Sequence, residues 1–479
     1  MRTLHKLFIV AIVSILTFYP IFANPNPSIS ISYTFRFENW NYFKFGQYQN
    51  SYNFYGLKIK PVLNFPFSQN AGLLIGLNLV SLGNLPSNAV APAPAGLLGL
   101  GANYYSSNTT LNNSSMTALC IRDLHFYYKS NSFSLKIGRF SFSDGNELID
   151  KFSPSLKFLK NTRISQRILG TFGFSYAERA FDGITFDYRP NDSTQLTFLY
   201  SKPTYGAFEL STANRTIDKI NLYYLSFNKA IDKNTDFRLF FANYNDDRNL
   251  LKPSNTPNIR GRTNINNLGL HFIKVIDKPN YLIDFVGWYS YQWGKWGDLG
   301  NNSIKHSAYA YDLEIGYKIK PINTQPYFRV YYFKSSGDTN PNDDKHQTFF
   351  SFLPTSRIYA LFPFYALQNL QDFGAQLIIS PSDKMKLKID YNILNLSSSK
   401  DGWYQGGGAF NNSVFGYIYK NSFNQSTLAN VLSLSINYEL TKKTSINMFY
   451  SIANGRDIIK RIFDKNTASY FFVEYNHKF

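Results

Sequence analysis

Apolar and polar residues alternate one by one along most of this chain, in segments of about ten residues. In ISISYTFRFE, residues 29–38, the odd positions are Ile, Tyr or Phe and the even positions are Ser, Thr, Arg or Glu. The same alternation returns in residues 55–65, 309–320, 385–391 and 431–440. Since successive side chains of a strand point to opposite faces, each segment predicts a strand with one apolar and one polar face.

The connections between these segments fall into a short class and a long class, which alternate along the chain. The short ones are residues 130–132, 189–193, 230–235, 275–280, 320–326, 380–384 and 440–443. The long ones lie near residues 81–116, 140–179, 202–217, 245–264, 292–307, 334–372, 395–429 and 453–467. Short turns at one end and long loops at the other are typical of outer-membrane barrels, whose closed sheet leaves no backbone group unpaired in lipid.

We therefore predict an all-β fold over residues 24–479: a transmembrane antiparallel β-barrel of about 18 strands, with short periplasmic turns and long extracellular loops. Side chains alone do not fill a barrel of that size, so the lumen is a channel or is partly plugged. The long loops 140–179, 334–372 and 395–429 are candidates to fold into it.

The composition favours a membrane barrel over a secreted β-sandwich or propeller. The chain contains 44 Phe and 36 Tyr, whereas charged residues make up only 17%. A secreted β-protein exposes a polar face and rarely needs so many aromatic residues. After residue 23 no apolar run reaches the roughly 18 residues that a transmembrane helix requires. The single cysteine, Cys120, excludes an internal disulfide.

Both ends of the chain carry features of an exported barrel. Arg2 and Lys6 precede the apolar run LFIVAIVSILTFYPIFA, which ends at Ala23. This order predicts a secretory signal peptide over residues 1–23, the alternative being an uncleaved membrane anchor. The last strand alternates and stops on Phe479, a pattern that resembles the signal read by the barrel assembly machinery.

The formal net charge is +18, and by strand parity many basic side chains face the polar interior of the predicted barrel. A wet lumen spares these groups desolvation, and rings of Arg and Lys are how anion pores select charge. Arg163 and Arg167 lie four residues apart in a long loop, so a short helix would carry both on one face. The candidate pore-lining or anion-binding residues are Arg36, Lys58, Lys60, Arg139, Arg163, Arg167, Arg179, Asp182, Asp187, Arg189, Arg238, Arg329 and Lys388.

Two reservations apply to these candidates. The parity that Arg139 shares with Ile137 points it toward lipid, and a β-bulge at Gly138 would re-aim it. For each residue the alternative is structural, because Arg–Asp networks also stiffen barrel walls.

Catalysis and metal binding find little support in the sequence. Six histidines are scattered, and neither an HExxH nor a GxSxG motif is present. We predict a protein that is not an enzyme, with no cofactor and no nucleic-acid partner. The stretch GDTNPNDDK offers Asp338, Asp343 and Asp344 as oxygen ligands for Ca²⁺, although such loops are commonly plain solvated surface.

Two blocks of sequence resemble the alginate-export porins of Gram-negative outer membranes. The first is LKIGRFSFSDGNELI (135–149) with NTRISQRILGTFGFSYAERAFDGITFDY (161–188), and the second covers residues 337–377 and continues in DGWYQGGG (401–408). The resemblance implies an eighteen-stranded barrel with a narrow electropositive pore for an anionic uronate polymer. It also implies pore or loop roles for Arg139, Arg163, Arg167, Arg179 and Asp182. The chain departs from the family at Ser356 and Arg357, where relatives tend to show a histidine.

The resulting hypothesis is a passive outer-membrane channel for anionic solutes, among them an anionic polysaccharide such as alginate. Its expected partners are outer-membrane lipid, anionic small molecules or polysaccharide, and the assembly machinery at Phe479. Two alternatives stay open: a general diffusion porin whose arginines only brace the wall, and a barrel with an adhesive or enzymatic role.

Overall fold

The computed structural model describes residues 26–47, 50–86, 114–207, 210, 212–355 and 361–479. The predicted signal peptide and most of the connection near residues 81–116 lie outside this part of the chain.

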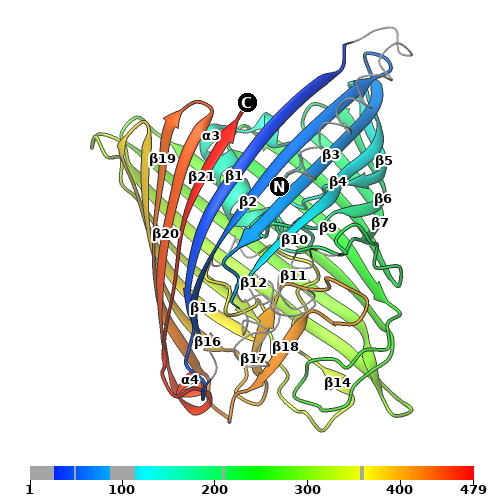
Figure 1. Cartoon of the computed structure of the whole chain (residues 1–479), viewed down its shortest axis with the longest axis vertical. Coiled ribbons are helices and arrows are strands. Elements are labelled where there is room, and N and C mark those ends of the chain that lie inside the picture. The colour runs from blue at the N-terminus through cyan, green and yellow to red at the C-terminus, as the bar shows by residue number, and fades with distance from the viewer. Residues whose placement is uncertain (1–25, 48–49, 87–113, 208–209, 211, 356–360) are drawn as a thin grey trace.

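Eighteen strands of the described chain form one closed antiparallel barrel, which confirms the predicted fold class (Figure 1). Each strand pairs with its neighbour in the chain, and β21 closes the barrel on β1, from Ser32–Lys478 to Asn41–Ser469. The strands are β1 (Ser28–Asn41), β2 (Ser51–Pro66), β3 (Ala71–Gly83), β4 (Ser115–Lys129), β5 (Phe133–Phe140), β6 (Phe181–Asn191), β7 (Thr194–Pro203), β8 (Ile220–Asp232), β9 (Thr235–Asp246), β10 (Thr263–Asp277), β11 (Tyr281–Leu299), β12 (Asn302–Ile319), β13 (Tyr327–Ser335), β15 (Leu370–Ser382), β16 (Met385–Leu396), β19 (Thr427–Thr441), β20 (Thr444–Gly455) and β21 (Thr467–Lys478).

The remaining elements are short and belong to the long connections. The two-residue β14 (Lys345–His346) pairs with β12 in parallel, and β17 (Gly402–Gly406) and β18 (Tyr417–Asn421) form a separate hairpin. The helical segments are η2 (Ile149–Lys151), α3 (Pro154–Leu159), the π-helical η3 (Lys160–Ile164) and α4 (Asp457–Ile462). None of the helices in the described residues is long and apolar enough to cross a membrane.

Alternation along each strand separates an apolar outer face from a polar inner face. On β12 the outward Leu313, Ile315 and Tyr317 are 59%, 43% and 44% exposed, whereas Asp312 and Glu314 between them are 2% and 5% exposed. Bare aromatic and aliphatic side chains thus form an outer band that suits contact with lipid. This band explains why the chain needs so many Phe and Tyr residues.

The connections sort by length onto the two ends of the barrel. Short turns join strands at the end where β1 begins and β21 ends, drawn at the top of Figure 1. The connections at the opposite end are 42–50, 84–114, 141–180, 204–219, 247–262, 300–301, 336–369, 397–426 and 456–466. By the usual rule for such barrels the short-turn end is periplasmic and the long-loop end is extracellular.

One predicted loop was wrong. The stretch 292–307 is not a long connection, because β11 and β12 continue through it to a two-residue turn at 300–301. The pairing register shifts between Lys295 and Gly297, so a bulge interrupts the alternation there without ending the strand. Gly300, at a φ of +60°, provides the tight reversal.

The outer band predicts a depth-dependent cost for charge on one strand. Leu313→Lys places an ammonium in the middle of the band and should destabilise the barrel by about 2–4 kcal/mol. Ile319→Lys, on the same face at the short-turn end of β12, should cost about 0–1 kcal/mol. Urea unfolding in lipid vesicles, followed by tryptophan fluorescence, measures both; equal costs would contradict the assignment of this face to lipid.

Candidate functional site

The connection 141–180, hereafter the inward loop, leaves β5 at the long-loop end and runs through the lumen to the opposite mouth. There the backbone N–H of Ser153 donates to the carbonyl of Lys233, in the short turn after β8, at 2.8 Å. Lys151 Nζ lies 3.2 Å from Asp192 in the short turn after β6. Figure 1 accordingly shows α3 at the short-turn end of the barrel. The inward loop therefore occupies the lumen over its whole length.

The helical part of the inward loop begins with a serine N-cap and ends in a π-helical turn. Ser153 caps α3, its Oγ accepting the N–H of Leu156, and Pro154 occupies the first helical position. The chain then widens into the π-helical η3, which contains Arg163. Arg167 lies beyond this helix, so the two arginines do not share a helix face as predicted. Arg167 Nε instead donates to the carbonyl of Arg163 at 2.7 Å.

A buried ion-pair cluster fixes the inward loop to β9 and β10. Lys160 Nζ lies 2.7 Å from both Asp236 and the carbonyl of Glu147, and the same Asp236 oxygen lies 2.7 Å from His271. Arg238 lies 3.2 Å from Asp144 of the loop. Since Lys160 and Asp236 are fully buried, removing either partner leaves a desolvated charge, which is strongly destabilising.

A second cluster fixes the loop to β11, β12 and β13. Arg163 Nε lies 2.8 Å from Glu314, and Arg167 forms an ion pair with Asp312. Arg329 of β13 bridges Glu314 at 2.9 Å and Asp284 at 2.6 Å. The arginines predicted to select anions are therefore already neutralised by carboxylates of the wall.

A third cluster surrounds Glu178, near the end of the inward loop. Its carboxylate lies 2.8 Å from Lys58, 3.3 Å from Lys60 and 3.0 Å from Arg122. Burial alone would raise the pKa of Glu178, but these charges hold it well below its usual value. Glu178 is therefore ionised, and two of the predicted pore lysines are its partners.

The sequence predicts that Arg179 lines the pore, but in the structure its side chain binds backbone carbonyl groups. Its guanidinium donates to the carbonyls of Gly170 at 2.9 Å, Leu353 at 3.2 Å and Gly407 at 2.9 Å. Those carbonyls belong to the inward loop and to the connections 336–369 and 397–426. One buried side chain thus joins three loops inside the barrel.

Arg139 and Asp182 lie on the outer face of the wall, which corrects their prediction as lumen residues. They are direct partners in the β5–β6 register and form an ion pair at 2.7 Å. The register is regular at Gly138, so no bulge turns Arg139 inward. Thr216, from the connection after β7, also donates its hydroxyl to Asp182, at 2.5 Å. The pair therefore fastens this loop to the wall.

The other predicted residues lie on the inner face. Arg36 pairs with Glu474 of β21, and Phe174 of the inward loop covers its guanidinium at 4.2 Å. Asp187 and Arg189 lie near the short turn after β6, where both hydrogen-bond to Gln195 at 3.0 Å. Lys388 lies 3.1 Å from Asp390 on β16.

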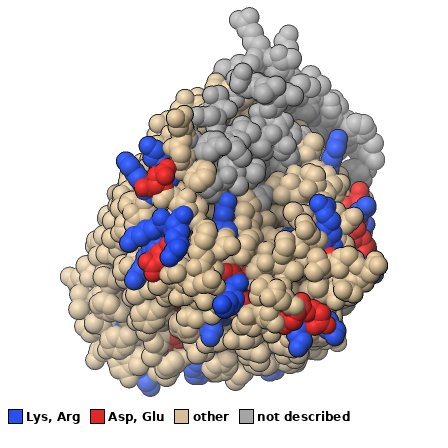
Figure 2. Space-filling view, turned by 90° about the horizontal axis from the view of Figure 1, so that it is seen from below, with Lys and Arg blue, Asp and Glu red and all other residues tan. Residues whose placement is uncertain are grey.

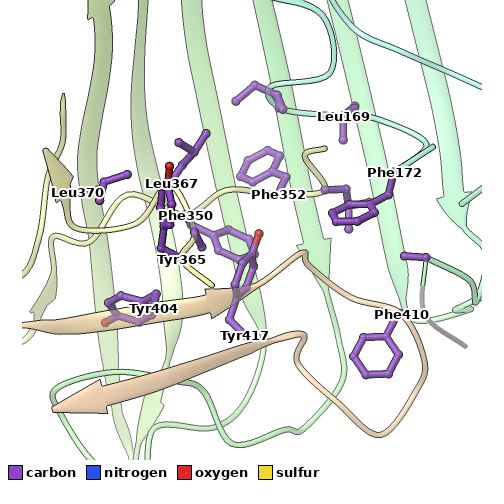
Figure 3. Close-up of a cluster of buried hydrophobic side chains, with 14 of the residues drawn as sticks. Leu169, Phe172, Phe350, Phe352, Tyr365, Leu367, Leu370, Tyr404, Phe410 and Tyr417 are labelled. Atoms are coloured by element: carbon purple, nitrogen blue, oxygen red, sulfur yellow. The ribbon is translucent and has the colours of Figure 1, made fainter. Parts of the chain in front are cut away.

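Aromatic side chains from the connections 336–369 and 397–426 fill the long-loop half of the lumen. Figure 3 shows Phe350, Phe352, Tyr365, Tyr404 and Tyr417 clustered between the barrel wall and the β17–β18 hairpin. The ring centroids of Phe350 lie 5.5 Å from Phe352 and 6.0 Å from Tyr417. Such contacts pack like a protein core, and they form an aromatic plug.

A cavity of about 530 Å³, hereafter the vestibule, occupies the short-turn half of the lumen. The inward loop lines one side with Phe158, Arg163 and Phe174, and Leu361 and Tyr365 line it from the connection 336–369. The opposite wall, from β1 and β19 to β21, is rich in uncharged hydrogen-bonding groups: Thr34, Ser433, Ser435, Asn437, Asn447 and Asn476. The charged lining residues are Arg36, Lys58, Arg163, Lys386, Lys388, Asp390 and Glu474.

Lys386 differs from the other cations of the vestibule. It is exposed near the start of β16 and makes no ion pair with a described residue, whereas Arg36, Lys58, Arg163 and Lys388 each have a carboxylate partner. Among the cations that line the vestibule, the unpaired one therefore lies at the periplasmic mouth, beside a short turn.

Sequence reasoning missed the partners inside the inward loop. Asp144, Glu147, Lys160 and Glu178 carry the ion pairs that position the loop, together with Arg122 on β4. Strand parity does not apply to loop residues. The bulge between Gly76 and Leu77 in the β3–β4 register further disturbs parity around Arg122. The one signal in the sequence was that residues 144–178 carry many charged residues of both signs, as a loop bound to a charged wall would.

The predicted calcium ligands have other partners. Asp343 accepts the backbone N–H of Lys345, Asp344 pairs with Lys305, and Asp338 lies against Asp401. In the residues that the structure describes, no three or more His, Cys, Asp or Glu side chains are grouped to hold a metal ion. Calcium binding at this loop stays a prediction.

Asp338 and Asp401 join the two connections that form the plug. The backbone N–H of Asp338 donates to Asp401 at 3.0 Å, and Thr348 and Tyr404 donate their hydroxyls to the same carboxylate. Burial raises the pKa of Asp338 to about 7 and that of Asp401 to about 6. Packing of the plug is therefore coupled to protonation.

A family comparison identifies the kind of barrel. A sequence model of alginate export proteins matches residues 121–452. This chain belongs to the alginate export family. The family and the barrel fold place it in the outer membrane of Gram-negative bacteria as a channel protein.

Solved structures of outer-membrane channels share the fold of this family member. Acinetobacter baumannii OccAB2 matches at a TM-score of 0.60 and 11% identity, over 95% of this chain and 98% of that one. Pseudomonas aeruginosa OccK9 (OpdG) matches at 0.58 and 9%, with the same coverage. P. aeruginosa OpdK, solved with vanillate, matches at 0.56 and 7%, over 94% and 98%. No curated protein sequence matches the chain.

The buried Lys160–Asp236 pair predicts that the inward loop can be released by one substitution. Lys160→Met leaves Asp236 without its ammonium partner and should cost about 3–5 kcal/mol of loop docking. The matched control is Lys151→Met, whose pair with the exposed Asp192 is worth about 0–1 kcal/mol. Single-channel conductance in planar bilayers should rise and fluctuate only in the first variant. Indistinguishable traces would show that this pair does not hold the loop.

The raised pKa values of Asp338 and Asp401 predict that the plug loosens as the pH rises. Both carboxyls bind a proton more tightly in the folded chain than in the unfolded one. The stabilisation is therefore complete below their ordinary pKa of 3.8 and is lost as the pH rises to about 7. Protease cleavage within 397–406, normalised to a reference peptide, should be faster at pH 8 than at pH 5. Asp338→Asn should reduce this difference and Asp343→Asn should not; a flat profile in the parent protein contradicts the coupling.

Proposed function

We propose that this member of the alginate export family is a passive channel for hydrophilic solutes that carry carboxylates, and that it catalyses no reaction. The observation that carries the proposal is the vestibule, with unpaired positive charge at its mouth and a wall of hydroxyl and amide groups beyond it. Its volume of about 530 Å³ is in the range of small-molecule sites.

Lysines supply the anion preference in this proposal. Lys386 and Lys388 line the vestibule from β16, and Lys318 of β12 lies within electrostatic range of Lys386. An ammonium near a short turn stays hydrated and raises the local concentration of anions without desolvation. A passing carboxylate can then exchange hydrogen bonds along Ser433, Ser435 and Asn437 without being held.

The buried arginines act as braces rather than as an anion ladder. Arg163, Arg167 and Arg329 share Asp284, Asp312 and Glu314, so a passing anion meets a nearly neutral cluster. This arrangement supports the structural role for wall arginines that the sequence left open. It also predicts a moderate anion selectivity, set at the mouth.

Two comparisons with known proteins support carboxylates as the class of solute. The family is described as exporting alginate, and OpdK was solved with vanillate, a small aromatic carboxylate. A small carboxylate fits within the vestibule as it stands. A uronate polymer needs the aromatic plug to move aside, since the plug fills the extracellular half of the lumen.

A catalytic role has no comparable support among the described residues. His271 contacts Asp236, His306 contacts His346, and His477 contacts the hydroxyl of Thr444. None of these contacts joins a histidine to a nucleophile that lines the vestibule. An adhesive or enzymatic barrel is therefore the weaker hypothesis.

The test is the reversal potential of the purified protein in a planar bilayer under a salt gradient. The parent should prefer anions, and Lys386→Glu with Lys388→Glu should lower the anion-to-cation permeability ratio several-fold, because two charges reverse within a Debye length of the path. Lys384→Glu, in the adjoining turn but not lining the vestibule, is the control. Arg163→Gln should alter conductance more than selectivity. If the arginine variant abolishes selectivity while the lysine variant keeps it, the assignment of roles is wrong.

A further inference from the structure

Exposed basic residues gather at the extracellular rim, where β20 and β1 end and β21 begins. Arg456, Lys460, Arg461 and Lys465 lie in the connection 456–466, and Lys44 lies in the neighbouring connection 42–50. The backbone N–H of Asp464 donates to the carbonyl of Lys44 at 2.8 Å, which ties the two connections together. These five residues are called the rim cluster below.

The local fold directs the rim cluster away from the lumen. In α4, Ile458 and Ile459 are fully buried, and the ring of Phe463 lies 5.4 Å from that of Phe43 and 6.3 Å from that of Trp403. This apolar side packs into the barrel. Arg456, Lys460 and Arg461 lie on the opposite side of the helix, because residues four apart share a face.

The positive charge of the rim cluster is only partly offset, since five cations lie beside two carboxylates, Asp457 and Asp464. Asp457 and Asp464 are engaged with the hydroxyl of Thr427 and the N–H of Gly46, at 2.7 and 2.6 Å. None of the five cations forms an ion pair with a described residue. Other exposed cations on this rim do: Arg262 with Asp247 at 3.0 Å, and Lys305 with Asp344 at 3.2 Å.

Figure 2 shows this face of the molecule, with several separate groups of charged side chains on a mainly uncharged surface. A large group of basic side chains lies on the left, the side on which Figure 1 places α4. Further basic groups lie at the centre and on the right of this view, with acidic side chains beside several of them.

The height of the rim cluster matches that of lipid headgroups. On β20 the outward Met448 and Tyr450 are 40% and 42% exposed and belong to the apolar band, which continues to Ile452. Arg456 follows Ile452 by four residues. At about 3.3 Å per residue and a strand tilt of about 40°, this places Arg456 about 10 Å beyond the band. Headgroups extend about 5–8 Å beyond the hydrocarbon, within reach of long cationic side chains.

We propose that the rim cluster binds the phosphate groups of lipid headgroups in the outer leaflet of the membrane. Several guanidinium and ammonium groups with no protein partner, facing outward at headgroup height, provide what a phosphate requires. The site is independent of the proposed transport function, since it lies at the opposite end of the barrel from the vestibule mouth. Its role is to anchor this part of the rim to the bilayer.

The test compares lipid binding by the full chain and two matched variants, using native mass spectrometry of the detergent-solubilised protein. The probes are diphosphorylated lipid A and, as a lipid without a terminal phosphate, phosphatidylethanolamine. The rim variant is Arg456→Gln, Lys460→Gln, Arg461→Gln and Lys465→Gln. The control is Lys384→Gln, Lys442→Gln and Lys443→Gln, in the short turns of the neighbouring strands. Retention of the barrel fold is checked by heat-modifiable mobility in SDS.

The rim variant should bind lipid A about tenfold more weakly than the parent or the control, with phosphatidylethanolamine binding unchanged in all three. Arg456→Lys with Arg461→Lys, which keeps the charge, should retain most of the binding. Equal loss in the control variant, or unchanged binding in the rim variant, overturns the proposal. So does a rim variant that keeps lipid A but loses binding of a soluble oligouronate, which would assign the cluster to an exported polyanion.

Discussion

Closure of the sheet is the constraint on which the rest of the structure depends. A backbone that crosses lipid must satisfy every N–H and C=O internally, and the pairing of β1 with β21 removes the last open edge. Once closed, the wall divides each strand into a face toward lipid and a face toward the lumen. Eighteen strands enclose more space than wall side chains fill. The loops then determine what kind of channel the barrel becomes.

The inward loop shows how a barrel of this size is narrowed without a second domain. Its three charged clusters contact β9 and β10, then β11 to β13, and finally β2 and β4. Apart from the partly exposed Lys60, the charges of these clusters are largely buried, so their ion pairs are costly to break singly, although they need not add net stability over an apolar core. They give the loop one position in a lumen that would otherwise admit many. Arg179 extends this positioning to the two loops of the plug.

The positions of the basic residues distinguish paired arginines in the interior from exposed lysines near the turns. A count of basic residues does not show this difference. Arginines, with their planar fork of donors, hold carboxylates and backbone carbonyls in the interior. Lysines near the short turns are exposed to water, as Lys386 is where it lines the vestibule. Another excess of basic residues lies at the opposite rim, facing away from the lumen. The basic residues behind the net charge of +18 are thus partly paired in the interior and partly exposed at the two ends of the barrel.

Strand alternation, turn lengths and aromatic content were sufficient to predict an outer-membrane barrel of about eighteen strands, because lipid on one side and water on the other impose a two-residue period on each strand. That period also correctly indicated that Arg139 points outward. The sequence could not show which charges are free. Arg163 pairs with Glu314, Arg167 with Asp312, and Arg179 with the carbonyl of Gly407, all of them far away in the sequence. Only the folded loop brings those groups together, since ion pairing depends on proximity in space, which no local pattern records.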